Sequence, residues 1–148
     1  MNHSHEQDRT THRVLLAVDL AGSAAAASAG AIERARHDHA DLVVLSVLDP
    51  HNLHLAGSRT KRVDQERDRL ALGAQAIVQR ARDVGVAATY LIWEGDPADT
   101  ILEATAAEGA DLIVMGSRAR TNLRRLLLGS VSSEVARRAQ CEVLVVPS

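Results

Sequence analysis

Five short runs of mostly apolar residues recur along the chain, and longer helix-like stretches separate them. The runs are Val14–Val18, Leu42–Leu48, Val86–Trp93, Asp111–Met115 and Glu142–Val146. Continuous apolar runs of this length are typical of strands that are buried on both faces of a parallel sheet. Parallel strands need crossover connections, and helices supply them in right-handed βαβ units. The predicted fold class is therefore α/β, an open parallel sheet with helices on both faces.

Four helices are expected between these strands. Their predicted bounds are Ala24–His39, Arg59–Val84, Pro97–Glu108 and Ser130 to about Ala139. Ser23 is a candidate N-cap for the first helix, and Asp96 followed by Pro97 is typical of a helix start. The chain has one Trp, one Tyr and no Phe, so Val, Leu, Ile and Ala must build the core. Alanine-rich helices can pack close to a sheet, which suits a layered fold.

The length of 148 residues fits one domain. Residues 1–12 lack apolar periodicity and are expected to form a disordered tail, with residues 13–148 as the folded domain. The net charge of −2 gives no field that would attract nucleic acid or an anionic membrane. No apolar run approaches the roughly 20 residues that cross a bilayer, and the polar start does not resemble a signal peptide. The lone Cys141 is compatible with a reducing compartment, so the expected location is cytoplasmic.

Two strand ends carry residues with binding chemistry. The first run ends at Asp19, and the fourth ends at Gly116, where an arginine-containing stretch leads to Gly129-Ser130. In open parallel sheets, ligands bind beyond the carboxyl ends of the strands, where the strand order reverses. Glycines and a helix N-terminus can hold phosphate, and a carboxylate can accept hydrogen bonds from ribose. The pattern is typical of a nucleotide site, although βα loops without any ligand can carry the same residues.

The stretch Gly116-Ser117-Arg118-Ala119, nine further residues and then Gly129-Ser130 resembles a known motif. It is similar to the G-x-x-G-x9-G-[S/T] nucleotide motif of the universal stress protein family. The resemblance extends to the Val-Asp ending at Asp19, to the turn Glu94–Pro97 and to the ending Cys141–Pro147. It covers nearly the whole chain after the predicted tail.

This resemblance implies a Rossmann-like sheet in the order 3-2-1-4-5, of the adenine nucleotide alpha hydrolase type. It also implies ATP, with or without Mg²⁺ or Mn²⁺, and places the base near the end of the second strand and the ribose near Asp19. A regulatory role in a stress response, a homodimer formed through the C-terminal strand and an unidentified regulatory protein partner are implied as well. The implied binding residues are Asp19, Val47, Met115, Gly116, Arg118, Ala119, Gly129, Ser130, Val131 and Ser132.

Two departures from the family pattern leave an alternative open. Ala119 replaces the second motif glycine, and Leu20-Ala21 follows Asp19 where the family commonly has Gly-Ser. The alternative is a nucleotide-free interaction module of the same fold. A Walker lysine, a G-x-S-x-G elbow and paired carboxylates are absent from the sequence, so binding is favoured over catalysis, with at most slow ATP hydrolysis. The third functional hypothesis is a dedicated ATPase or phosphotransferase.

The remaining chemistry-bearing residues are interpreted as structural. The seven histidines have no recognisable ligand spacing, so no metal site is predicted. Trp93 and Cys141 are expected to pack in or beside the core. Charged helix residues such as Glu66 and Arg69 are expected to form solvent-exposed ion pairs of little energetic weight.

Overall fold

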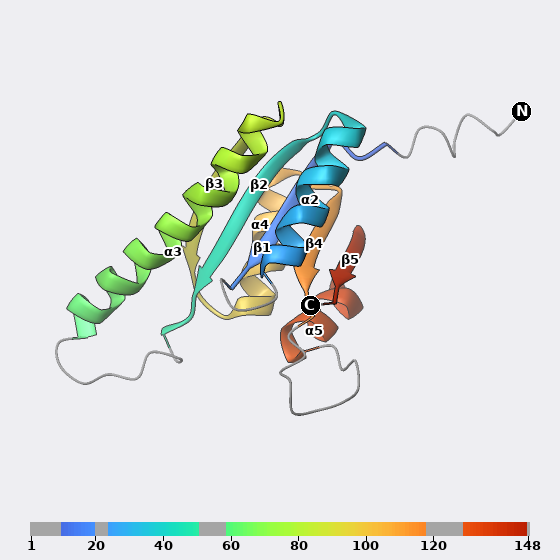
Figure 1. Cartoon of the computed structure of the whole chain (residues 1–148). Helices are drawn as coiled ribbons and strands as arrows, with labels where there is room; N and C mark the ends of the chain where they lie inside the picture. The colour runs from blue at the N-terminus through green and yellow to red at the C-terminus, as the bar shows by residue number, and fades with distance from the viewer. Residues whose placement is uncertain (1–9, 20–23, 51–58, 118–128, 148) are drawn as a thin grey trace, which may run out of the picture.

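A computed structural model describes residues 10–19, 24–50, 59–117 and 129–147 of the chain (Figure 1). Strands and helices alternate through these ranges as the sequence predicts, and each predicted boundary lies within two residues of the observed one. The candidate cap Ser23 lies outside the described residues. The elements are β1 (Arg13–Val18), α2 (Ala24–Asp38), β2 (Asp41–Leu48), α3 (Arg59–Asp83), β3 (Ala88–Glu94), α4 (Pro97–Glu108), β4 (Leu112–Gly116), α5 (Ser130–Arg138) and β5 (Glu142–Val146).

The five strands form one parallel sheet in the order β3-β2-β1-β4-β5. The central strand β1 pairs with β2 on one side and with β4 on the other, so Val14 lies between Leu42 and Leu112. The chain builds outward from β1 to β3, returns past β1 to β4 and ends at β5. The predicted fold class and strand order are confirmed, and the reversal point lies between β1 and β4.

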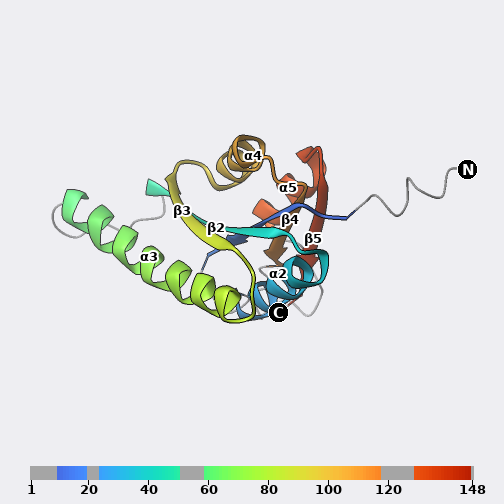
Figure 2. The ribbon, with the colours of Figure 1, turned by 90° about the horizontal axis from the view of Figure 1, so that it is seen from above.

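Two helical layers cover the sheet (Figure 2). Helices α2 and α3 lie on one face, and α4 and α5 lie on the other. Small residues face the sheet from α2, where Ala27, Ala31 and Ala35 recur every four residues and are almost fully buried. This stripe lets α2 approach the central strands closely, as the alanine-rich composition predicts. In the described part of the chain, no helix is both long enough and apolar enough to cross a membrane.

Carboxylates tie down the residues that precede β1. Asp111 accepts hydrogen bonds from the backbone N–H groups of His12 and Arg13 at 2.9–3.1 Å. Asp38 accepts one from the backbone N–H of Thr11 at 3.2 Å. Two residues of the predicted tail are therefore bound to the fold, and residues 1–9 lie outside the described ranges. The division into tail and domain stays a prediction.

Candidate functional site

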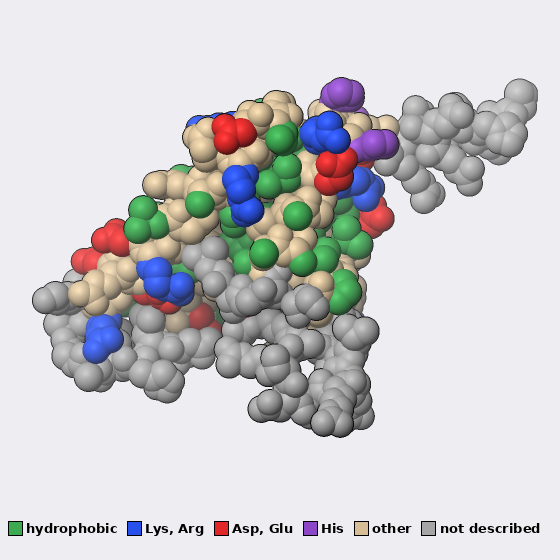
Figure 3. Space-filling view, viewed as in Figure 1, with side chains coloured by type: hydrophobic (Ala, Val, Ile, Leu, Met, Phe, Trp, Pro, Cys, Tyr) green, Lys and Arg blue, Asp and Glu red, His purple; other side chains and the backbone are tan. Residues whose placement is uncertain are grey.

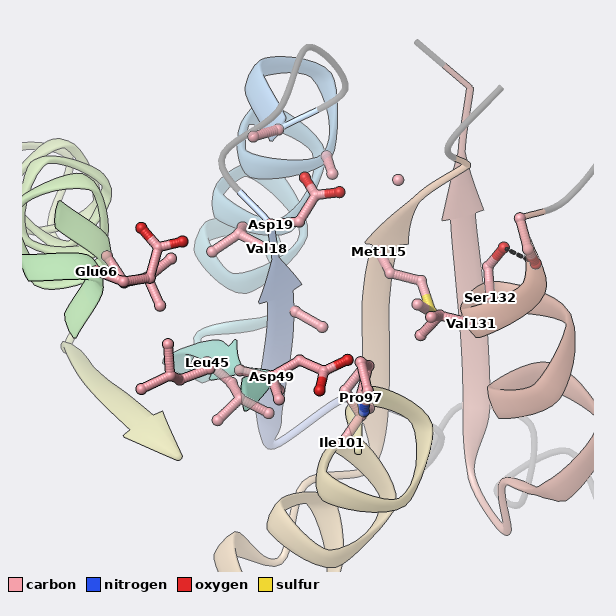
Figure 4. A pocket seen from close by; sticks show the side chains of 18 of the residues that line it. Val18, Asp19, Leu45, Asp49, Glu66, Pro97, Ile101, Met115, Val131 and Ser132 are labelled. Atoms are coloured by element: carbon pink, nitrogen blue, oxygen red, sulfur yellow. Dashed lines mark hydrogen bonds between the residues drawn. The ribbon is translucent and has the colours of Figure 1, made fainter. Parts of the chain in front are cut away.

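A pocket of about 250 Å³ opens at the carboxyl ends of the strands, where the strand order reverses (Figure 4). The ends of β1, β2 and β4 form its floor, and all four described helices contribute to its wall. The lining residues are Ala17, Val18, Asp19, Ala24, Ala27, Leu45, Val47, Leu48, Asp49, Glu66, Arg69, Leu70, Pro97, Ile101, Met115, Gly116, Gly129, Val131 and Ser132.

Seven of the ten predicted binding residues meet in this pocket. Asp19 comes from the end of β1, Val47 from β2, and Met115 and Gly116 from β4; Gly129, Val131 and Ser132 come from the start of α5. Ser130 is exposed at the first position of α5 and is not among the described lining residues. Arg118 and Ala119 lie outside the described residues, so their binding roles stay predictions.

The start of α5 gives the pocket a set of backbone donors. Gly129 is the N-cap, and it has no side chain with which to cap the N–H groups of the first turn. Ser132 is 2% exposed, and its hydroxyl donates to the Gly129 carbonyl at 3.1 Å (Figure 4). A helix N-terminus of this kind carries partial positive charge and attracts anions. This end of the pocket is therefore suited to phosphate.

The turn between β3 and α4 shapes another part of the wall. The backbone N–H of Gly95 donates to the Leu48 carbonyl at 3.0 Å, which ties the end of β3 to the end of β2. Gly95 has φ of 153°, and a Cβ there would lie 2.7 Å from the Thr100 hydroxyl, so only glycine fits without displacement. Asp96 then caps α4 by accepting from the Asp99 N–H at 3.2 Å. The turn thereby places Pro97 and Ile101 in the pocket.

Apolar side chains supply a surface on which a flat ring could pack. Leu45, Val47, Ile101 and Met115 lie on this side of the pocket, and Leu45, Ile101 and Met115 are at most 5% exposed. Trp93 packs against the core cluster on the α4 side, in agreement with its predicted packing role. The pocket thus combines an apolar wall with an anion-binding end.

Three charged residues of the pocket were missed as site residues by the sequence interpretation. Asp49 follows β2, and Glu66 and Arg69 belong to α3. The expected ion pair of Glu66 and Arg69 is present, with Nη2–Oε2 at 3.0 Å, but it lies on the pocket wall. A sequence signal was available, because Glu66 is four residues before the apolar Leu70 and therefore shares its inward helix face.

In the described ranges, no group of three or more His, Cys, Asp or Glu side chains is placed to hold a metal ion. Cys141 is partly exposed beside the second core cluster. Burial, reinforced by the negative charge of Asp111, raises the pKa of its thiol, which keeps it in the less reactive protonated form.

Comparisons with known proteins give one consistent assignment. The model of the Universal stress protein family matches residues 10–147. A universal stress protein of Thermus aquaticus is 34% identical over 137 residues, which cover 90% of this chain and 96% of the relative. The universal stress protein MJ0531 of Methanocaldococcus jannaschii is 44% identical over 70 residues, but these are 47% of this chain and 41% of that protein. The aligned part thus spans less than half of that second relative.

Solved structures agree with this assignment. The universal stress protein UspA from Lactobacillus plantarum superimposes with a TM-score of 0.80 at 26% identity, covering 91% of this chain and 97% of that one. A universal stress protein from Archaeoglobus fulgidus, solved in complex with dAMP, has a TM-score of 0.72 at 24% identity, covering 93% and 98%. The second likeness shows the shared fold. With the family match over residues 10–147, these findings establish that the chain belongs to the universal stress protein family.

Proposed function

We propose that this protein binds an adenine nucleotide, ATP, in the pocket at the carboxyl ends of the sheet. The proposal rests on the observation that three kinds of binding surface line that one pocket. An apolar wall, the carboxylate of Asp19 and the uncapped start of α5 correspond to the base, ribose and phosphates of a nucleotide. The volume of about 250 Å³ lies just below the usual range for ligand pockets, about 300–1,000 Å³.

Each part of the nucleotide has proposed contacts. The base packs between Val47 and Met115, and the ribose hydroxyls donate to Asp19. Gly116 and the α5 start at Gly129 take the phosphates through backbone N–H groups. Ser130, Arg118 and Ala119 complete the proposed phosphate site on the strength of the motif resemblance. Mg²⁺ or Mn²⁺, where present, is held by the phosphate oxygens, and no protein ligand for it is proposed.

A relative supports the ligand class. The similar Archaeoglobus fulgidus protein was solved in complex with dAMP, which is an adenine nucleotide. The choice of ATP over a monophosphate rests on the resemblance of residues 116–130 to the family's nucleotide motif.

The proposed role is regulatory, with at most slow ATP hydrolysis. Among the described lining residues, Arg69 is the one with a permanent positive side-chain charge, and it belongs to α3, which lies on the opposite face of the sheet from α5. Phosphoryl transfer usually relies on a cation that reaches the transferred group, so this described wall favours binding over turnover. The regulatory partner and the cytoplasmic location stay predictions.

The homodimer is proposed to form through the outer edge of β5. Within the described sheet, β5 pairs with β4 alone, and Leu144 is 39% exposed on it. An apolar edge strand is prone to pair with another chain, and an antiparallel pairing with a second copy would cover it. Val143 and Val145 pack against the core, so Leu144→Lys is a cleaner test than substitutions there.

Light scattering at micromolar concentration should give a dimer for the wild type and a monomer for Leu144→Lys. Leu72→Lys is the matched control, because Leu72 is 69% exposed on α3, and this variant should stay dimeric. A wild-type monomer would remove the homodimer from the proposal.

Mass spectrometry tests nucleotide binding directly. Protein purified without added nucleotide should release an adenine nucleotide when it is heat-denatured, and calorimetry should show that the emptied protein binds ATP. Absence of both bound nucleotide and ATP binding at millimolar concentration would favour the nucleotide-free interaction module.

A further inference from the structure

None of the described residues that line the pocket has an aromatic side chain. The chain has no Phe, and its one Tyr and one Trp lie elsewhere. Tyr90 accepts a hydrogen bond from the Gln75 side chain at 2.9 Å and packs against the core cluster under α2 and α3. Trp93 packs against the cluster on the α4 side. Proteins often hold bases by stacking them on aromatic rings or on arginine, so a flat group of the second kind would have to take that role here.

Arg69 is such a flat group, and it lines the pocket. Glu66, one turn earlier on α3, binds its guanidinium through both carboxylate oxygens, with Nη2–Oε2 at 3.0 Å. A two-point contact of this kind fixes the plane of the guanidinium, because it restricts rotation of the group. The Arg69 side chain is still 56% exposed. The pair therefore presents a planar cation that has room to contact a ligand.

The pair lies away from the proposed phosphate end of the pocket. Helix α3 and helix α5 lie on opposite faces of the sheet (Figure 2). In Figure 4, Glu66 lies on one side of the pocket, and Ser132 at the start of α5 lies on the other. Because the phosphates are proposed to bind at the α5 start, Arg69 is placed to meet the opposite end of the nucleotide, which is the base.

We propose that Arg69, held by Glu66, stacks its guanidinium on the face of the base that the apolar side chains of the pocket leave open. This inference rests on the proposed function. Leu45, Leu48 and Leu70 line the pocket and are at most 4% exposed, so they offer an apolar surface for the other face. A guanidinium is weakly hydrated and is attracted by the negative face of a π-system. The base would then be held between a cation and an apolar surface without any aromatic residue.

Stacking can be separated from a simple attraction between Arg69 and the phosphates. Arg69→Tyr keeps a flat group and removes the charge, whereas Arg69→Lys keeps the charge and removes the flat group. A stacking role therefore depends mainly on the plane, and a role in attracting phosphate depends on the charge. Salt gives a second distinction, because it screens attraction between separated charges but has little effect on a stacking contact.

The test measures the dissociation constant of ATP by calorimetry. Arg69→Met should weaken ATP binding by about two- to fivefold, as expected for the loss of a partly exposed cation–π contact. Arg69→Tyr should bind ATP within about twofold of the wild type, and Arg69→Lys should recover at most half of the loss. The loss in Arg69→Met should be the same at about 0.05 M and about 0.5 M salt.

Arg80→Met is the matched control, since Arg80 is exposed on the same helix and is not among the described lining residues. It should bind ATP as the wild type does, and thermal melting should show that all variants are folded. Three results overturn the stacking role while the proposed function stands: recovery by Arg69→Lys but not by Arg69→Tyr, a loss that disappears at the higher salt concentration, or unchanged ATP affinity in Arg69→Met. Wild-type protein that does not bind ATP overturns the proposed function itself, and the stacking role with it.

Discussion

The two ends of the sheet use their charged side chains in different ways. At the amino end, Asp38 and Asp111 accept hydrogen bonds from the backbone N–H groups of residues 11–13. At the carboxyl end, Asp19, Asp49 and Glu66 line a pocket. Carboxylates at the amino end thus anchor the residues that precede β1, while those at the carboxyl end line a space that a ligand can fill. The amino end serves stability, and the carboxyl end is where we propose that the nucleotide binds.

Helix direction explains part of this difference. Each crossover helix runs opposite to its strands, so helix N-termini lie at the carboxyl end of the sheet and helix C-termini at the amino end. The last turns at the amino end are basic, with Arg36 and His37 in α2 and Arg80 and Arg82 in α3. The arginines complement the negative helix ends, whereas the N-terminus of α5, which has no side-chain cap, leaves positive potential at the pocket. Figure 3 shows basic, acidic and histidine side chains together around α2 at the amino end.

The largest expected effect on stability contrasts the two ends of α4. Gly95→Ala, before α4, should lower the free energy of unfolding by about 2–3 kcal/mol, because φ of 153° is strained for alanine and the Cβ meets Thr100. Gly109→Ala, after α4, should cost only about 1 kcal/mol, because φ there is 65° and the added Cβ meets open space. Urea unfolding of both variants measures this, and equal losses would contradict the account of the turn.

Asp111→Ala tests the amino end. The change removes the acceptor of two backbone N–H groups and should lower the free energy of unfolding by about 1.5–3 kcal/mol. ATP affinity should not change, because Asp111 lies at the opposite end of the sheet from the pocket. Asp111→Asn keeps an acceptor and should cost less. If Asp111→Ala unfolds at the same urea concentration as the wild type but fails to bind ATP, the separate roles of the two sheet ends are contradicted.

A smaller effect is expected from pH. Hydrogen bonds from His37 and then Arg34 hold the pKa of Asp38 well below its usual range. Because unfolded Asp has a pKa of about 3.9, this stabilisation is complete above about pH 4 and is lost as the pH falls toward the folded value. Between pH 5 and pH 3 the wild type should lose about 1 kcal/mol more than Asp38→Asn. Urea unfolding at both values checks this, and parallel losses would contradict the role of Asp38.

The sequence predicts the fold better than the site. Buried apolar runs and the Asp96-Pro97 helix start depend on local patterns, and the observed bounds follow them closely. Asp19 and Gly116 line one pocket because β1 and β4 are neighbours, in the strand order that the family resemblance implies. The contribution of α3 was missed because it depends on how far a long helix extends past the sheet. The spacing of Glu66 and Leu70 indicates the inward face of α3, but not that this face meets the ends of β1 and β2 in a pocket.

Calorimetry of ATP with wild-type protein, Asp19→Ala and Asp111→Asn tests the central claim most directly. The account predicts that wild type and Asp111→Asn bind ATP with the same affinity. Asp19→Ala should bind about tenfold or more weakly, since it loses charge-assisted hydrogen bonds to the ribose. Unchanged ATP affinity in Asp19→Ala would contradict the assignment of this pocket as the nucleotide site.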